Sequence, residues 1–324
     1  MKLSSIKQEV EIYSLFKNVD DSILLLNPIL KKHGFIFEEH NLLSLEANFA
    51  NLYSFKESKK TLNYINSDVD NQYSLDFNYH YNMSLFGGPN LEESPKAYFL
   101  KSLKNYTVNE NYEVINKKDY EIGINMERFT KSLIRKLHLY KNGDIMSPVR
   151  FRITKNSKKI ISKVIKRTIR PINHQNLIID SQELLTIENL INKDLEPTSL
   201  TELSESFFFN SYEVFDSKIR FINLMTCLES IFNNNTHQIA HTISRHLSII
   251  MSENKAEFNE NYNRIKKLYS IRNTIVHGQP FNKKEKLADL IKEVQNLVRF
   301  SILYCIENKL TKNDLFNELN SKGF

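Results

Sequence analysis

The sequence predicts an α+β region followed by an all-α helical bundle. Residues 1–176 mix period-two and helical patterns, β signals vanish from about Asp180, and four apolar-periodic segments fill the last part of the chain. A chain of 324 residues is long enough for two domains of ordinary size. We therefore expect one domain at 1–176 and a second at 177–324.

The clearest strand pattern lies at residues 73–85, where apolar and aromatic side chains alternate with polar ones from Tyr73 to Leu85. Such alternation is typical of an antiparallel strand with one buried and one solvated face. Helical spacing of apolar residues predicts a helix over 126–142 with Gly143 as its C-cap. Alternating apolar and arginine residues then predict a strand over 149–153.

The second domain reads as helical throughout. Asp180-Ser-Gln-Glu183 has the form of a capping box and predicts a helix through Ile191. Apolar residues at helical spacing predict further helices over about 216–233, 236–252, 256–277 and 284–309. The short polar connections between them favour helices packed antiparallel to their neighbours.

Composition limits the function classes without selecting one. The chain has 44 Lys or Arg and 38 Asp or Glu, a net charge of +6 that permits nucleic-acid binding without requiring it. No apolar run approaches the ~18 residues that span a bilayer, and the first residues lack the apolar core of a signal peptide. We therefore expect a cytoplasmic protein with no membrane contact.

The chain has two cysteines, Cys227 and Cys305. Two are too few for a disulfide framework or a Cys-based zinc site, and we expect both in the core.

The sharpest local feature is Arg272-Asn273-Thr-Ile-Val-His277-Gly278, at the predicted end of the third bundle helix. Asn273 and His277 share a helix face, and the long Arg272 side chain can reach it. Gly278 places the imidazole at a helix C-terminus, where the dipole favours its protonated form. A permanent cation beside a titratable group suits phosphodiester chemistry. On spacing alone, a surface arginine and a capping histidine remain an open alternative.

The surroundings of this motif resemble the Apea-like branch of the HEPN family. A Leu228-Glu-Ser-Ile-Phe232 segment precedes the Ile271-Arg-Asn-Thr-Ile-Val-His-Gly278 ending by about forty residues, in the order that the family shows. The resemblance covers residues 216–309 well, and reaches the first half only loosely, around residues 137–144.

The resemblance implies a metal-independent endoribonuclease without a cofactor, often part of bacterial antiphage or toxin systems, in which two bundles pair around one cleft. Cleavage by the RNA 2′-hydroxyl needs a base and an acid, so we expect a homodimer or higher homo-oligomer that brings two His277 side chains together. Arg272 would stabilise the phosphorane, Asn273 would orient the phosphate or Arg272, and Glu229 would hold Arg272 unless it is a plain surface acid.

RNA is the expected partner, with transfer RNA as the candidate substrate, and the N-terminal region would respond to a viral trigger protein. The alternative is a non-catalytic dimeric binding or sensor module.

Two other features of the sequence each have two interpretations. The stretch between Asp144 and Asp180 contains basic residues and no acids. This composition favours salt-sensitive phosphate binding or a solubilising strand face. The RNA-binding candidates there are Lys158, Lys159, Lys163, Lys166 and Arg167.

His237 and His241 have the spacing of the zinc-protease helix motif, but Gln238 replaces its general base. We therefore expect a solvated helix face or, as the minor alternative, a structural metal.

Overall fold

A computed structural model of the chain describes residues 8–41, 96–108, 117–147, 149–154, 160–164, 175–214, 216–233, 237–279 and 286–322. These residues fall into two compact units, which we describe separately. The sheet unit has its described residues within Met1–His138, Gly143–Thr168 and Gln175–Ile191, and the helical unit within Leu139–Asn142 and Asn192–Phe324. An α+β unit followed by a helical unit is the architecture that the sequence predicts at this coarse level. The units part after Ile191, downstream of the boundary expected at 176/177.

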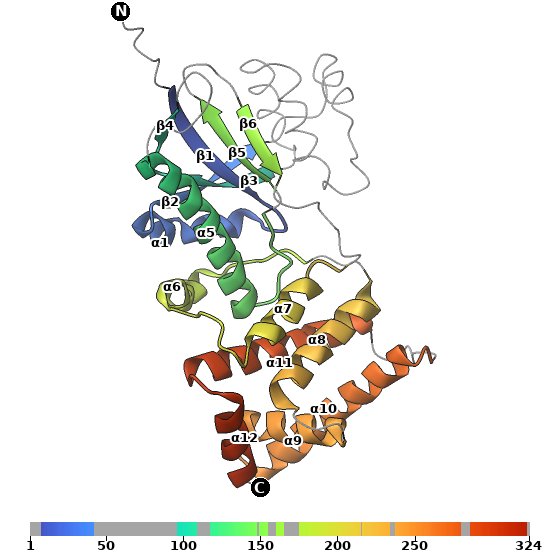
Figure 1. Ribbon diagram of the computed structural model, residues 1–324. Coiled ribbons are helices and arrows are strands. Elements are labelled where there is room, and N and C mark those ends of the chain that lie inside the picture. Colours follow the sequence, from blue (N-terminus) through green and yellow to red (C-terminus); the bar gives the residue numbers. More distant parts are fainter. Residues whose placement is uncertain are drawn as a thin grey trace, which may run out of the picture. The chain divides into compact units, whose positions relative to one another are not determined.

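The sheet unit is built on an antiparallel sheet (Figure 1). Its strands are β1 (Gln8–Phe16), β2 (Phe35–Asn41), β3 (Lys96–Ser102), β4 (Tyr106–Val108), β5 (Val149–Thr154) and β6 (Ile160–Val164). The strand order is β2-β3-β1-β5-β6, with β4 also paired to β1. In this register Tyr13 of β1 lies opposite Lys101 of β3 on one side and Phe151 of β5 on the other. The central strand β1 is therefore hydrogen-bonded along both of its edges.

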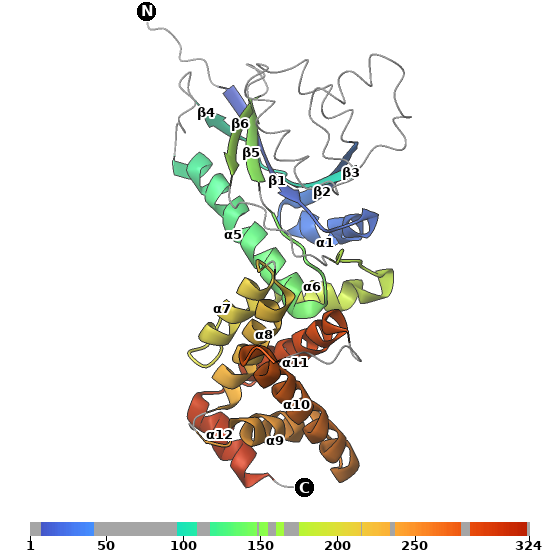
Figure 2. The ribbon, with the colours of Figure 1, turned by 90° about the vertical axis from the view of Figure 1, so that its right-hand side faces the viewer.

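Helices cover one face of this sheet: η1 (Asp21–Leu26), α1 (Asn27–Lys32) and α5 (Lys117–Tyr140). Phe129 of α5 stacks on Phe35 of β2 with ring centroids 4.2 Å apart, and Thr130 donates a hydrogen bond to Ser14 of β1. Figures 1 and 2 both show α5 running along the sheet. Burial of these apolar contacts against the strands stabilises the helix on the sheet.

Some of the elements predicted for the sheet unit are confirmed and others are not. The helix over 126–142 and the strand over 149–153 are confirmed as α5 and β5. Gly143 as the helix C-cap is wrong, because α5 ends at Tyr140. A Cβ on Gly143 would lie 2.8 Å from the backbone of Leu177, so the glycine permits a close approach of two segments. The strand expected at 73–85 lies outside the described residues.

The capping box at Asp180 and Glu183 is confirmed, and it opens η3 (Ser181–Glu183) and α6 (Leu184–Asn192). The helical unit contains α7 (Glu202–Ser211), α8 (Ser217–Phe232), α9 (Ile239–Met251), α10 (Lys255–Val276), α11 (Leu287–Glu307) and α12 (Lys312–Ser321). The four predicted bundle helices are confirmed as α8 to α11. None of the described helices is long and apolar enough to cross a membrane.

Helix α8 supplies much of the core of the helical unit. Several of its apolar side chains are fully buried: Phe221, Leu224, Met225, Leu228, Ile231 and Phe232. Cys227 and Cys305 are also fully buried, as the sequence predicts, and burial raises the pKa of both thiols, to about 12 for Cys305. Both cysteines therefore act as small apolar residues.

The C-terminus of α8 is capped from outside its own helix. The ammonium group of Lys312 donates hydrogen bonds to the carbonyl oxygens of Ser230 and Ile231, at 2.7 and 3.0 Å. A cation at the C-terminal end of a helix satisfies carbonyl groups that have no partner within the helix and complements its dipole. The end of α8 that carries Glu229 is thus fixed by α12.

Candidate active site

The motif that the sequence singles out lies at the C-terminus of α10, and the backbone closes the helix there. The N–H of Gln279 donates to the carbonyl of Thr274 at 2.9 Å, and the N–H of Gly278 donates to the carbonyl of Ile275 at 3.1 Å. These two bonds form a Schellman motif, with Gly278 at φ +66° in the left-handed position. His277 is the C-cap residue, as the sequence predicts from the glycine.

Arg272 lies on the last turns of α10, facing α8. Its Nε is 3.3 Å from Oε1 of Glu229, and the two side chains are 23% and 20% exposed. Both atoms are shielded from solvent, and their angle does not meet hydrogen-bond geometry, so the contact is an ion pair. Glu229 is therefore placed against Arg272 from the neighbouring helix, rather than standing apart as a surface acid.

Asn273 touches the same guanidinium from its own helix. Nη1 of Arg272 donates a hydrogen bond to Oδ1 of Asn273 at 3.3 Å. Asn273 also accepts a backbone hydrogen bond from His277 at 3.0 Å, one turn further along α10. Arg272, Asn273 and Glu229 thus form one contact group, and His277 follows it at the end of the helix.

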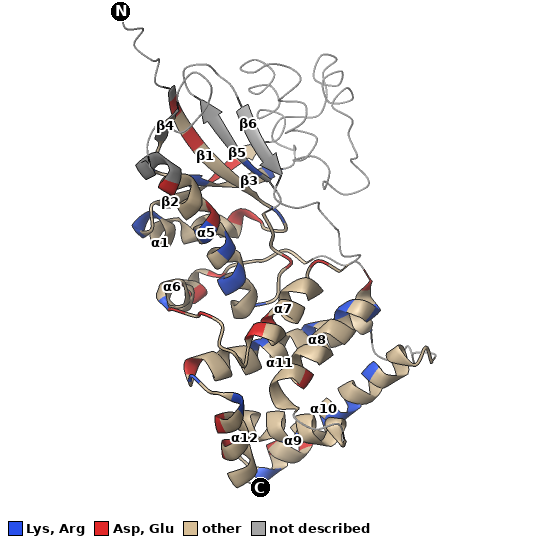
Figure 3. Cartoon of the chain, viewed as in Figure 1, with Lys and Arg blue, Asp and Glu red and all other residues tan. Residues whose placement is uncertain are grey.

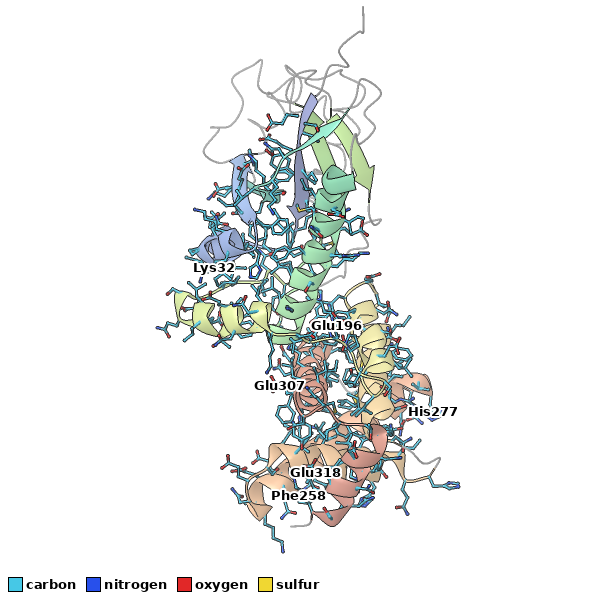
Figure 4. The ribbon with its side chains drawn as sticks, turned by 60° about the vertical axis from the view of Figure 1, so that its left-hand side comes forward. Lys32, Glu196, Phe258, His277, Glu307 and Glu318 are labelled. Carbon is cyan, nitrogen blue, oxygen red and sulfur yellow. The ribbon has the colours of Figure 1, made fainter. Side chains whose placement is uncertain are left out.

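The imidazole of His277 is exposed, and it makes no hydrogen bond or ion pair with the residues that the structure describes. Figure 4 shows His277 at the surface of the helical unit. A histidine in this position can exchange protons with solvent or with a bound molecule. General acid or base catalysis needs such access in at least one state of the enzyme.

The charged residues in the C-terminal part of α10 are all basic. From Asn261 to Gln279 the chain carries Arg264, Lys266, Lys267 and Arg272 and no acidic residue. Figure 3 shows Lys and Arg but no Asp or Glu along this part of α10. Arg264 is paired with Glu293 at 2.5 Å, whereas Lys266 and Lys267 are exposed. The exposed charge beside the motif attracts anions.

The predicted RNA-binding residues belong to the basic segment between Asp144 and Asp180. Lys158, Lys159, Lys166 and Arg167 are outside the described residues, and Lys163 lies on β6 opposite Arg150 of β5, with its side chain not described. Arg150 itself is paired with Glu127 of α5 at 2.9 Å.

The paired histidines do not share a helix face. His237 precedes α9, since Gln238 is the N-cap at φ +56°, so the expected face with both histidines is wrong for His237. His241 is on α9, exposed, and its Nδ1 lies 2.8 Å from the hydroxyl of Tyr262. Among the described residues, no three His, Cys, Asp or Glu side chains converge as a metal site would require.

One residue of the group is not singled out by the sequence. Tyr269, one turn before Arg272, is 6% exposed, and its ring centre lies 5.6 Å from the guanidinium carbon. In the sequence it reads as one apolar position of an amphipathic helix, and only the fold shows that the charge of Glu229, on α8, lies near it. No pattern within α10 alone could reveal that neighbour.

Comparison of the chain with protein-family models, curated proteins and solved structures finds no significant match in any of the three.

Proposed function

We propose that the chain is a metal-independent endoribonuclease of the HEPN type that works as a homodimer. The observation that carries this proposal is the pairing of a held guanidinium with an exposed imidazole at one helix end. Arg272 has its position fixed by Glu229 and Asn273, while His277 is accessible. Charge stabilisation and proton transfer are the two tasks of phosphodiester cleavage.

In the proposed reaction the 2′-hydroxyl of RNA attacks the neighbouring phosphorus. One His277 takes the proton of the 2′-hydroxyl, and the His277 of the second copy gives a proton to the leaving 5′-oxygen. The bond between phosphorus and that 5′-oxygen breaks, which leaves a 2′,3′-cyclic phosphate and a 5′-hydroxyl. Arg272 stabilises the charge on the phosphorane, a contribution of roughly 3 kcal/mol by analogy with oxyanion donors.

The need for a second copy follows from the count of proton-transfer groups. The chain supplies one histidine at this motif, and the reaction uses one base and one acid. A twofold axis beside α10 would place two copies of the motif around one phosphate. The exposed Val276, which is 46% accessible at the end of α10, offers apolar surface for such pairing.

Biological context rests on the resemblance alone. We propose a role in antiphage defence, with transfer RNA as the substrate and a viral protein as the trigger sensed by the sheet unit. The protein would act in the cytoplasm. The alternative is a non-catalytic dimeric binding or sensor module, and an RNA cleavage assay distinguishes it from a ribonuclease.

The test uses the purified full-length protein with total RNA in EDTA. His277→Ala should lower cleavage on the order of 10²- to 10⁴-fold, with an unchanged circular dichroism spectrum. The matched control is His237→Ala, which removes an exposed histidine of the same unit outside the motif and should cleave like the parent protein. Products should end in 2′,3′-cyclic phosphate and 5′-hydroxyl. Full activity of His277→Ala, or 5′-phosphate products, would remove the assignment, and absence of cleavage by the parent protein would favour the binding module.

A further inference from the structure

The guanidinium of Arg272 is contacted by three residues from two helices. Tyr269 lies against it from the preceding turn of α10, with 5.6 Å between ring centre and guanidinium carbon. Glu229 approaches Nε from α8 at 3.3 Å, and Asn273 accepts a hydrogen bond from Nη1. A cation over an aromatic face is attracted by the ring quadrupole. The ring and the carboxylate together restrict both the tilt and the rotation of the guanidinium plane.

Glu229 pairs with Arg272, and its charge also acts on Tyr269. Burial, together with the nearby Glu229 charge, raises the pKa of Tyr269 above its ordinary value. The nearby Arg272 charge opposes that shift only in part. The hydroxyl therefore stays protonated at neutral pH. A phenol that is 6% exposed and holds its proton is poorly suited to transfer protons to a substrate.

The outer part of the guanidinium is left for a ligand. Nε is shielded and faces Glu229, and one N–H of Nη1 goes to Asn273. The other terminal N–H groups make no hydrogen bond to the described residues. Arginine binds phosphate through such a planar fork, and the fork must be oriented correctly for bidentate contact.

We propose that Tyr269 is a positioning residue that, with Glu229, orients Arg272 for the phosphate of the substrate. This inference rests on the proposed ribonuclease function and assigns Tyr269 no contact with RNA. Because Arg272 acts mainly on charge that develops in the transition state, loss of its orientation lowers kcat more than it raises KM.

The central variant is Tyr269→Leu, which keeps apolar bulk and removes the ring. We expect kcat to fall about tenfold, the size of a partly desolvated cation–π contact, with KM changed less than about twofold. Tyr269→Phe keeps the ring and should restore kcat to within about threefold of the parent protein. The matched control is Tyr262→Leu on the same helix, whose ring has a lysine, Lys266, at the same distance of 5.6 Å, and which should leave kcat unchanged.

An unchanged kcat in folded Tyr269→Leu overturns the inference, since Tyr269 would then be structural only. Loss of activity in Tyr269→Phe as complete as in His277→Ala also overturns it, because the hydroxyl would then take part in the chemistry. Where Tyr269→Leu does not fold, Glu229→Gln replaces it, with the same expected fall in kcat and the same refuting result.

A readout independent of cleavage separates this inference from the proposed function. The Nε–H signal of Arg272 in ¹⁵N nuclear magnetic resonance spectra should be slow to exchange in the parent protein and faster in Tyr269→Leu and Glu229→Gln. If His277→Ala still cleaves RNA but this signal behaves as expected, the ribonuclease assignment fails and the orientation of Arg272 stands. If His277→Ala is inactive while Tyr269→Leu matches the parent in kcat and exchange, only the role of Tyr269 fails.

Discussion

The ion pair between Glu229 and Arg272 should couple α8 to α10 measurably, whether or not the protein cuts RNA. At 3.3 Å, with an effective dielectric constant of about 20, the gross attraction is about 5 kcal/mol. Desolvation removes most of this gain. Exposed pairs retain about 0.2–1 kcal/mol, whereas removing one partner of a buried pair costs about 3–5 kcal/mol. With 23% and 20% of the two side chains exposed, we expect a coupling free energy of about 1–2 kcal/mol.

A double-mutant cycle measures this coupling. Glu229→Ala, Arg272→Ala and the double variant are unfolded in urea and followed by circular dichroism at 222 nm, because the chain has no tryptophan. The control cycle uses Lys193 and Glu307, paired at 2.6 Å in the same unit with side chains 49% and 45% exposed, for which we expect about 0.5 kcal/mol or less. A coupling at Glu229 and Arg272 no larger than at the control pair would refute the reasoning.

Two further predictions concern the stability of the helical unit. Burial, with the nearby Arg245 and His241 charges, lowers the pKa of His246, whose Nδ1 lies 3.3 Å from the carbonyl oxygen of Phe232. The unfolded chain then binds the proton more readily, so stability falls as pH drops below about 6.5, and His246→Gln should flatten this dependence in urea midpoints taken from about pH 7.5 to pH 5. An equally steep curve in the variant would contradict this. Asp216 caps α8 by accepting from the N–H groups of Lys218 and Ile219, so Asp216→Ala should lower the free energy of unfolding by about 1 kcal/mol and Asp216→Asn by far less. Equal losses in the two variants would show that the cap does not matter.

The bundle helices could be predicted because each has an amphipathic face and polar ends. The helix predicted at 256–277 is α10, Lys255–Val276, and the glycine after His277 locates its end. Helix α12 was not predicted, although Thr311 and Asp314 form a capping box that the sequence displays. A short helix of ten residues gives a weaker periodic signal than its longer neighbours.

The sheet was harder to predict because of burial on both faces. Residues from Ile12 to Phe16 of β1 are all buried, so the strand lacks the alternation that reveals an edge or half-exposed strand.

Contacts between helices could not be predicted from the sequence either. The sequence leaves open whether Glu229 holds Arg272 or is a plain surface acid, and only the packing of α8 on α10 brings their atoms to 3.3 Å. Tyr269 could not be predicted as part of the group, because a tyrosine at an apolar position looks the same whether or not its ring packs against a cation.

The residue that follows His277 shows how stereochemistry and catalysis can be confused in a short motif. An added Cβ on Gly278 would meet nothing within 4 Å, so crowding does not exclude a side chain there. The backbone angle does, because an L-residue is strained at φ +66° and its mirror image would not be. Glycine at this position is therefore what helix closure demands of handedness. It would be present in a purely structural protein too, so Gly278 indicates nothing about chemistry, which depends on Arg272 and His277.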